Sequence, residues 1–158
     1  MNESIEEQLV HRLIENHWHI ACAESCTGGM LADRIVNVAN ASKVLKVSFV
    51  TYAEEAKQTY CNVSPDTLSN HGVVSEAVAG EMAKGVTLTS GAEVGVGITG
   101  IAGPAGGTKE LPVGTVCFGY CLPTHTVTET IHFDNMSRNE VRAAATEHAL
   151  RSLLLQLC

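Results

Sequence analysis

Short apolar runs alternate along this chain with longer segments in which apolar residues recur every three or four positions. Runs of the first kind are typical of buried strands, and the longer segments are typical of amphipathic helices. The pattern predicts strands over 18–23, 46–52, 92–98, 113–122 and 125–133. It predicts helices over 5–16, 53–60, 65–70, 75–90 and 137–155, and one more that follows a turn at residues 24–29 and ends near residue 36.

Helix-start signals support these boundaries. Ser4 and Ser137 are each followed three residues later by glutamate, which is the pattern of a capping box. Ser64-Pro65 supplies a cap and a proline at the first helical position, and Gly91 marks a helix end. Strands alternate with helices at first, and a hairpin and a closing helix follow. We therefore expect an α/β protein of one domain, residues 1–158, in which helices cover both faces of a mixed sheet.

Charge and composition exclude several classes of function. The formal net charge is −7, and a nucleic-acid footprint would need clustered lysine and arginine, so we expect no nucleic-acid partner. No apolar run is long enough to span a membrane, and the acidic, polar start does not resemble a secretory signal. We therefore expect a cytoplasmic protein with no membrane partner.

The six cysteines do not indicate a metal site. Cys22/Cys26 and Cys117/Cys121 have three residues between them, which lies within loose zinc spacing. Their neighbours are apolar or aromatic, however, and a buried cysteine behaves as a small hydrophobic residue. We expect no metal, no structural disulfide and no cofactor.

The turn that follows the first predicted strand has two interpretations. Ser25 stands there, and Gly28 and Gly29 follow within what we expect to be the first helical turn, where each glycine costs roughly 1 kcal/mol relative to alanine. Ser25 either caps the helix or is a functional serine beside which a ligand approaches the backbone. The pattern alone favours the cap.

Unusual residues also follow the next two predicted strands. Tyr52 and Lys57 follow the second strand, and a glycine-rich loop begins at Thr99 after the third. In a parallel sheet these ends share one edge, where ligands bind. Each feature also has a plainer interpretation. Tyr52 would be an aromatic residue at a strand end, Lys57 an exposed lysine paired with Glu54, and the loop a flexible turn. We interpret Arg138 as a surface arginine or an anion ligand, and we place His17 and His19 on one strand face as surface or packing residues.

Taken together, the motifs of this chain resemble the CinA carboxy-terminal domain family over about residues 5–155. The segments that carry the resemblance, in the family's order, are Ala23-Glu24-Ser25-Cys26-Thr27-Gly28-Gly29, Val50-Thr51-Tyr52 with Glu55-Ala56-Lys57, His71-Gly72-Val73-Val74-Ser75-Glu76, Thr99-Gly100-Ile101-Ala102-Gly103-Pro104-Ala105-Gly106-Gly107 and Pro112-Val113-Gly114-Thr115-Val116. The resemblance implies a three-layer α/β/α sandwich with a mixed, mostly parallel sheet, and a homodimer.

The resemblance also implies an activity and a set of site residues. It implies a nicotinamide-nucleotide amidohydrolase that converts nicotinamide mononucleotide to nicotinic acid mononucleotide and ammonia without a metal. Ser25 would be the nucleophile and Lys57 its base, with Tyr52 as a third catalytic residue. We expect substrate contacts from Cys26, Thr27, Gly28, Thr99, Gly100, Gly106, Gly107 and Arg138.

Three places depart from the family pattern. Leu111 stands where many relatives have lysine, and Asn40 and Val47-Ser48 stand where glycines are frequent. Losing a cation at Leu111 would weaken nucleotide binding if that position lies near the substrate. This leaves an alternative, in which the chain is a catalytically degenerate nucleotide-binding paralogue.

Overall fold

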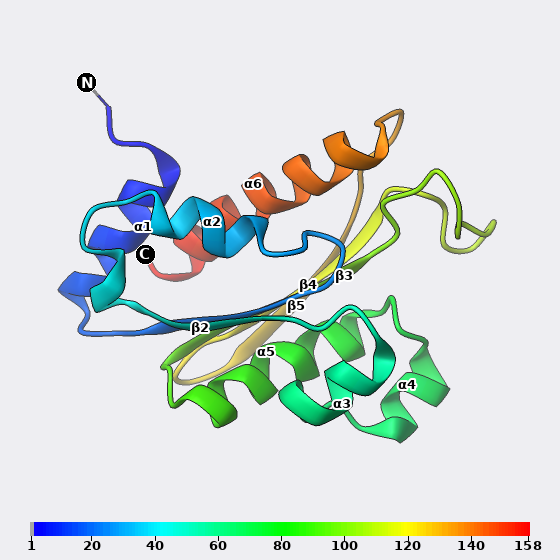
Figure 1. The fold of residues 1–158 in the computed structure, drawn as a ribbon, viewed down its shortest axis with the longest axis horizontal. Helices are drawn as coiled ribbons and strands as arrows, with labels where there is room; N and C mark the ends of the chain where they lie inside the picture. The colour runs from blue at the N-terminus through cyan, green and yellow to red at the C-terminus, as the bar shows by residue number, and fades with distance from the viewer. Residues whose placement is uncertain (1) are drawn as a thin grey trace.

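A five-stranded sheet lies between two layers of helices in the computed structural model, which describes residues 2–158 (Figure 1). The strand order is β2-β1-β3-β4-β5. The strands are β1 (Ile20–Glu24), β2 (Leu45–Val50), β3 (Val94–Gly100), β4 (Thr115–Cys121) and β5 (Thr126–His132). The helices are α1 (Ile5–Glu15), α2 (Met30–Val36), the short 3-10 helix η1 (Ala41–Lys43), α3 (Glu54–Cys61), α4 (Pro65–His71), α5 (Glu76–Ser90) and α6 (Arg138–Gln156).

The sheet is mixed and mostly parallel, as expected. Strand β1 pairs in parallel with both β2 and β3, whereas β4 is antiparallel to β3 and β5. Strand β4 is therefore the one strand of the sheet that runs in the opposite direction. The carboxyl ends of β1, β2 and β3 consequently meet at one edge, and the loops that follow them lie side by side.

Each face of the sheet is covered by its own set of helices, which confirms the three-layer arrangement. Helices α1, α2 and α6 cover one face, and α3, α4 and α5 cover the other (Figure 1). Helix α5 lies very close to the sheet because β3 and β4 carry glycines beneath it. A Cβ at Gly97 or Gly119 would stand 2.3 Å from the carbonyl oxygen of Ala79. These two glycines thus set the spacing between α5 and the sheet.

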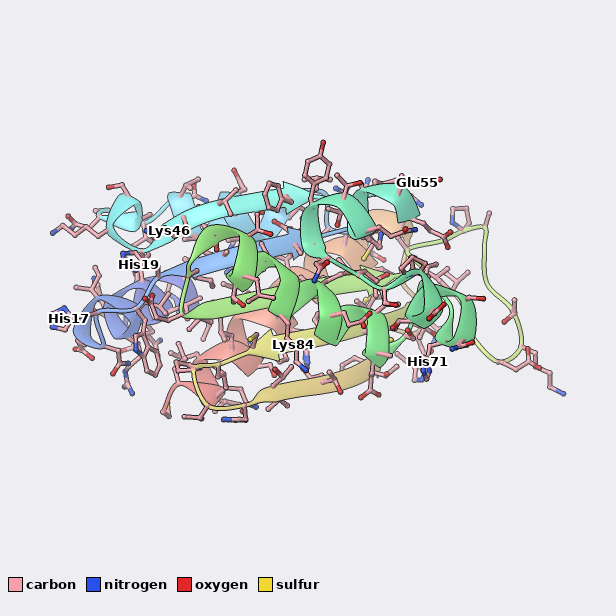
Figure 2. All side chains as sticks on the ribbon, turned by 90° about the horizontal axis from the view of Figure 1, so that it is seen from below. His17, His19, Lys46, Glu55, His71 and Lys84 are labelled. Atoms are coloured by element: carbon pink, nitrogen blue, oxygen red, sulfur yellow. The ribbon has the colours of Figure 1, made fainter. Side chains whose placement is uncertain are left out.

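The amino end of β1 differs from the prediction. The strand begins at Ile20, and His17 adopts a left-handed turn with φ of 57° that joins α1 to it. His19 precedes the strand and binds Glu93 through its ring, at 3.0 Å. The prediction that His17 and His19 share a strand face is therefore wrong. Both lie at the opposite end of the molecule from His71 (Figure 2).

Two further findings concern the chain as a whole. Both predicted capping boxes form, at Ser4 with Glu7 and at Ser137 with Glu140. Within residues 2–158, none of the helices is both long and apolar enough to cross a membrane.

Candidate active site

Ser25 stands in a tight turn between β1 and α2. Its backbone N–H donates to the carbonyl of Ile98 on β3 at 3.1 Å, and its carbonyl accepts from the N–H of Gly28 at 3.1 Å. Gly28 and Gly29 have φ of 58° and 102°, a conformation that glycine adopts at little cost. Helix α2 begins only at Met30, and the residue at its N-cap is Gly29, which offers no side chain. Ser25 is therefore not the cap, and the glycines shape the turn before the helix rather than its first turn.

The cap of α2 is provided by Glu24, a residue to which we assigned no role from the sequence. Its buried carboxylate accepts hydrogen bonds from the N–H groups of Leu31 at 2.9 Å and Ala32 at 3.1 Å. It also accepts from the hydroxyls of Thr27 at 2.7 Å and Ser48 at 3.1 Å. A buried carboxylate needs such partners, and the positive end of a helix favours it. Glu24 therefore fixes the position of the residue next to it, Ser25, and accepts from two backbone N–H groups at the start of α2.

Lys57 lies beside Ser25 and is fully buried. Its Nζ donates to the carbonyl of Thr51 at 2.6 Å and to Ser25 Oγ at 3.1 Å. The interpretation of Lys57 as an exposed lysine paired with Glu54 is therefore wrong. Burial lowers the pKa of Lys57 from its usual value, because an ammonium ion is poorly solvated inside the protein. The structure thus joins a nucleophilic side chain to an amine that loses its proton more easily than a surface lysine.

Ser25 and Lys57 line a pocket of about 290 Å³ at the carboxyl ends of β1, β2 and β3. Hydrophobic side chains of the loop before α5 and of the glycine loop form part of its wall, namely Val73, Val74, Ile101 and Ala102. Among residues 2–158, the lining contains two basic side chains, Lys57 and Arg138, and no carboxylate. In a chain of net charge −7, this is a local basic site. Such a lining fits a ligand that has a flat apolar part and a negative charge.

Arg138, the first residue of α6, reaches back across the pocket rim. Its Nη1 donates to the carbonyl of Gly103 at 2.7 Å, and its Nη2 donates to the hydroxyl of Tyr52 at 2.9 Å. Tyr52 is 62% exposed and lines the pocket at this rim. The guanidinium therefore bridges the glycine loop and the segment after β2, which are distant in sequence.

The other expected contact residues divide into two groups. Those that line the pocket are Cys26, Thr99, Gly100 and Gly106. Those that do not are Thr27, Gly28 and Gly107. Thr27 is buried and donates its hydroxyl to Glu24, Gly28 lies against Arg142, and Gly107 lies against Val113. These three residues shape the loops and do not form part of the pocket surface.

The surroundings of Cys26 and Leu111 determine the protonation of the Cys26 thiol and the position of Leu111 relative to the pocket. Burial raises the pKa of the Cys26 thiol to about 11, so the thiol stays protonated at neutral pH although it lines the pocket. Leu111 lies in a turn in which its N–H donates to Thr108 Oγ1, and it is not part of the pocket lining. The departure from the family pattern at Leu111 therefore falls outside the pocket wall.

Fold and site together define an α/β/α protein with a buried serine–lysine pair in a basic pocket beyond the parallel strands. The family model of the CinA C-terminal domain matches residues 2–157, so the chain belongs to the CinA C-terminal domain family. The sequence is 45% identical over 154 residues to a putative competence-damage inducible protein of Clostridium novyi (strain NT), covering 98% of this chain and 37% of the relative. It is 44% identical over 158 residues to a CinA-like protein of Chlorobaculum tepidum, covering 98% and 37%.

Solved structures of the same family share the fold. The competence damage-inducible protein A of Klebsiella pneumoniae superposes with a TM-score of 0.92 at 34% identity, covering 97% of this chain and 94% of that one. A CinA superfamily protein of Escherichia coli gives 0.91 at 37% identity, covering 98% and 88%. The chain thus spans little more than a third of the curated relatives it matches but nearly all of these solved chains.

Proposed function

We propose that this chain hydrolyses the carboxamide of nicotinamide mononucleotide, giving nicotinic acid mononucleotide and ammonia. The observation that carries the proposal is the contact between Lys57 Nζ and Ser25 Oγ, 3.1 Å apart at the base of the pocket. A serine with an amine base within hydrogen-bond reach is a combination that acyl transfer uses. The names of the relatives describe competence-damage proteins, so the activity itself rests on the site and the resemblance.

The residues present suffice for both halves of a hydrolysis. Ser25 Oγ attacks the carboxamide carbon while the neutral amine of Lys57 takes the hydroxyl proton. The resulting ammonium then gives a proton to the departing nitrogen, so that ammonia leaves and an acyl ester of Ser25 remains. A water molecule attacks this ester, with Lys57 again taking the proton, and Ser25 is restored. The carbonyl of Thr51 holds Lys57 Nζ in place beside the serine.

The pocket also supports the choice of a nucleotide. Val73, Val74 and Ile101 offer an apolar surface for a pyridine ring. Arg138 lies among the glycines of the loop after β3, where a phosphate would meet a cation and exposed backbone N–H groups. A substrate with an aromatic amide at one end and a phosphate at the other matches both regions.

Ammonia release from nicotinamide mononucleotide, compared between the wild-type chain and Ser25→Ala, tests the proposal. We expect steady release from the wild type and a loss of at least about 1000-fold in kcat for the variant, since the covalent route is removed. Equal release from both proteins would contradict the serine mechanism. Binding of the nucleotide by both proteins without release from either would favour the alternative, a degenerate nucleotide-binding paralogue.

A further inference from the structure

Arg142, in the second turn of α6, donates hydrogen bonds to the serine turn, which is the turn of residues 25–29 between β1 and α2. Its Nε donates to the carbonyl of Cys26 at 2.8 Å, and its Nη2 reaches the carbonyl of Thr27 at 3.4 Å. Its Nη1 is held by Asn139 Oδ1 at 3.1 Å, one turn earlier on the helix. Arg142 does not line the pocket, unlike Arg138. It therefore acts on the Cys26–Thr27 and Thr27–Gly28 peptide groups and not on a ligand.

These contacts fix the direction of the turn's N–H groups. In a trans peptide the N–H points opposite to the carbonyl of the preceding residue. With the carbonyl of Cys26 held by Arg142, the N–H of Thr27 is directed away from that arginine. The N–H of Cys26 likewise points away from the carbonyl of Ser25, which binds Gly28 across the turn. Within residues 2–158 neither N–H has a hydrogen-bond acceptor on another residue, whereas most backbone N–H groups in proteins are paired.

At the nearby start of α2, the first four N–H groups of the helix all have acceptors among residues 2–158. Glu24 takes the N–H groups of Leu31 and Ala32, as described above. A negative charge that develops on an atom bound to Ser25 Oγ therefore has the turn itself as its nearest source of unpaired backbone donors. Of the two residues with unpaired N–H groups, Cys26 lines the pocket, and a backbone N–H next to the nucleophile is a donor of the kind that stabilises oxyanions.

We infer that Arg142 is a positioning residue: it holds the segment from Cys26 to Gly28, so that Gly28 stays bonded to the carbonyl of Ser25 and the N–H of Cys26 binds the oxyanion formed at Ser25. The inference rests on the proposed function, because it takes Ser25 as the nucleophile. It goes further by naming an oxyanion donor and the side chain that sets it. Glu24 fixes the turn on the side of α2, and Arg142 fixes it on the side of α6.

The test compares Arg142→Met, which keeps the length of the side chain without its donors, with Arg142→Lys, which keeps one donor for the carbonyl of Cys26. Arg34→Gln is the matched control, since Arg34 pairs with Glu6 and Glu147 on the same face of the sheet but does not touch the turn. Two quantities are measured for each protein. One is kcat and KM for ammonia release from nicotinamide mononucleotide, and the other is the rate at which a fluorophosphonate probe labels Ser25, followed by mass spectrometry.

We expect Arg142→Met to lower kcat by about 10- to 100-fold with KM within about twofold. The reason is that the N–H donor binds the oxyanion in the transition state and not the bound substrate, so misplacing it weakens transition-state binding alone. Labelling should slow in parallel, Arg142→Lys should recover part of both rates, and Arg34→Gln should keep both. A rise in KM alone would overturn the inference in favour of substrate binding, and a kcat within twofold of wild type would overturn it outright. If the wild type releases no ammonia, labelling still decides: slower labelling of Arg142→Met supports the inference while the proposed substrate fails. Equal labelling, or no labelling of wild-type Ser25, overturns it.

Discussion

Lys57 Nζ lies 3.1 Å from Ser25 Oγ, although the two residues are 32 positions apart in the chain. The parallel pairing of β1 and β2 brings them together, because the segments that follow both strands begin at the same edge of the sheet. Ser25 follows β1 at once, and α3 turns Lys57 back over that edge. The pair is therefore a product of topology, and the sequence between the two residues builds α2, η1, β2 and the start of α3.

The activity should rise with pH as Lys57 loses its proton. The base must be neutral to accept the proton of Ser25, and burial lowers the pKa of Lys57 below its usual value of 10.5. A plot of kcat/KM for nicotinamide mononucleotide against pH should therefore rise with pH, and the midpoint of this rise should lie below 10.5. Lys57→Arg, which stays charged throughout, should show no measurable turnover. A rising limb centred at or above 10.5, or turnover by the arginine variant, would count against Lys57 as the base.

Lys57 should also make the free energy of unfolding depend on pH. Between its lowered pKa in the folded protein and 10.5, the unfolded chain binds more protons at this residue than the folded chain does. The free energy of unfolding of the wild type should therefore increase with pH across that window, relative to Lys57→Met. Urea unfolding of both proteins at intervals between pH 7 and 10 measures this difference. Other titrating groups contribute to both proteins alike, so a difference that stays flat or falls with pH would mean that Lys57 is not destabilised in its charged form.

Arg138 at the pocket rim tests where the phosphate of the substrate binds. Its guanidinium donates to both Gly103 and Tyr52, so it is held beside the glycine loop. We expect Arg138→Gln to raise KM for nicotinamide mononucleotide by about tenfold or more, which corresponds to the loss of one charge-assisted contact of about 1.5 kcal/mol. Nicotinamide riboside, which lacks the phosphate, should be processed equally by the variant and the wild type. Equal losses with both substrates would place the arginine away from the phosphate.

The order of strands and helices and both capping boxes could be predicted because they depend on local periodicity and on residues close in sequence. The environment of Lys57 could not, since its spacing from Glu54 in sequence suggested a surface pair, and only the packing of α3 over the sheet edge buries it. Glu24 was missed for a related reason. A glutamate at the end of an apolar strand is unusual, but its partners on α2 and β2 lie up to 24 positions away. The folded arrangement alone identifies it as a cap.

Glu24 should contribute strongly to stability. Glutamine fits the same space, but its amide N–H₂ would face donors that now meet a carboxylate oxygen. We expect Glu24→Gln to lower the free energy of unfolding by about 2–3 kcal/mol, whereas Ser48→Ala, which removes one of the carboxylate's donors, should cost about 1 kcal/mol. Urea unfolding at pH 7 measures both. If Glu24→Gln cost no more than Ser48→Ala, the carboxylate would not be the cap that holds α2 and the serine turn.

Leu111 provides a direct test of whether the chain has lost activity. The family resemblance led us to expect lysine there, and a missing cation would matter if the side chain reached the nucleotide. The structure places Leu111 in the turn with Thr108, outside the pocket lining, and the cations of the pocket are Lys57 and Arg138. We therefore expect Leu111→Lys to change kcat and KM for nicotinamide mononucleotide by less than about twofold, since its ammonium would remain in solvent. A gain of tenfold or more in kcat/KM would show instead that the loop brings position 111 to the substrate, and that leucine there weakens this chain as an enzyme.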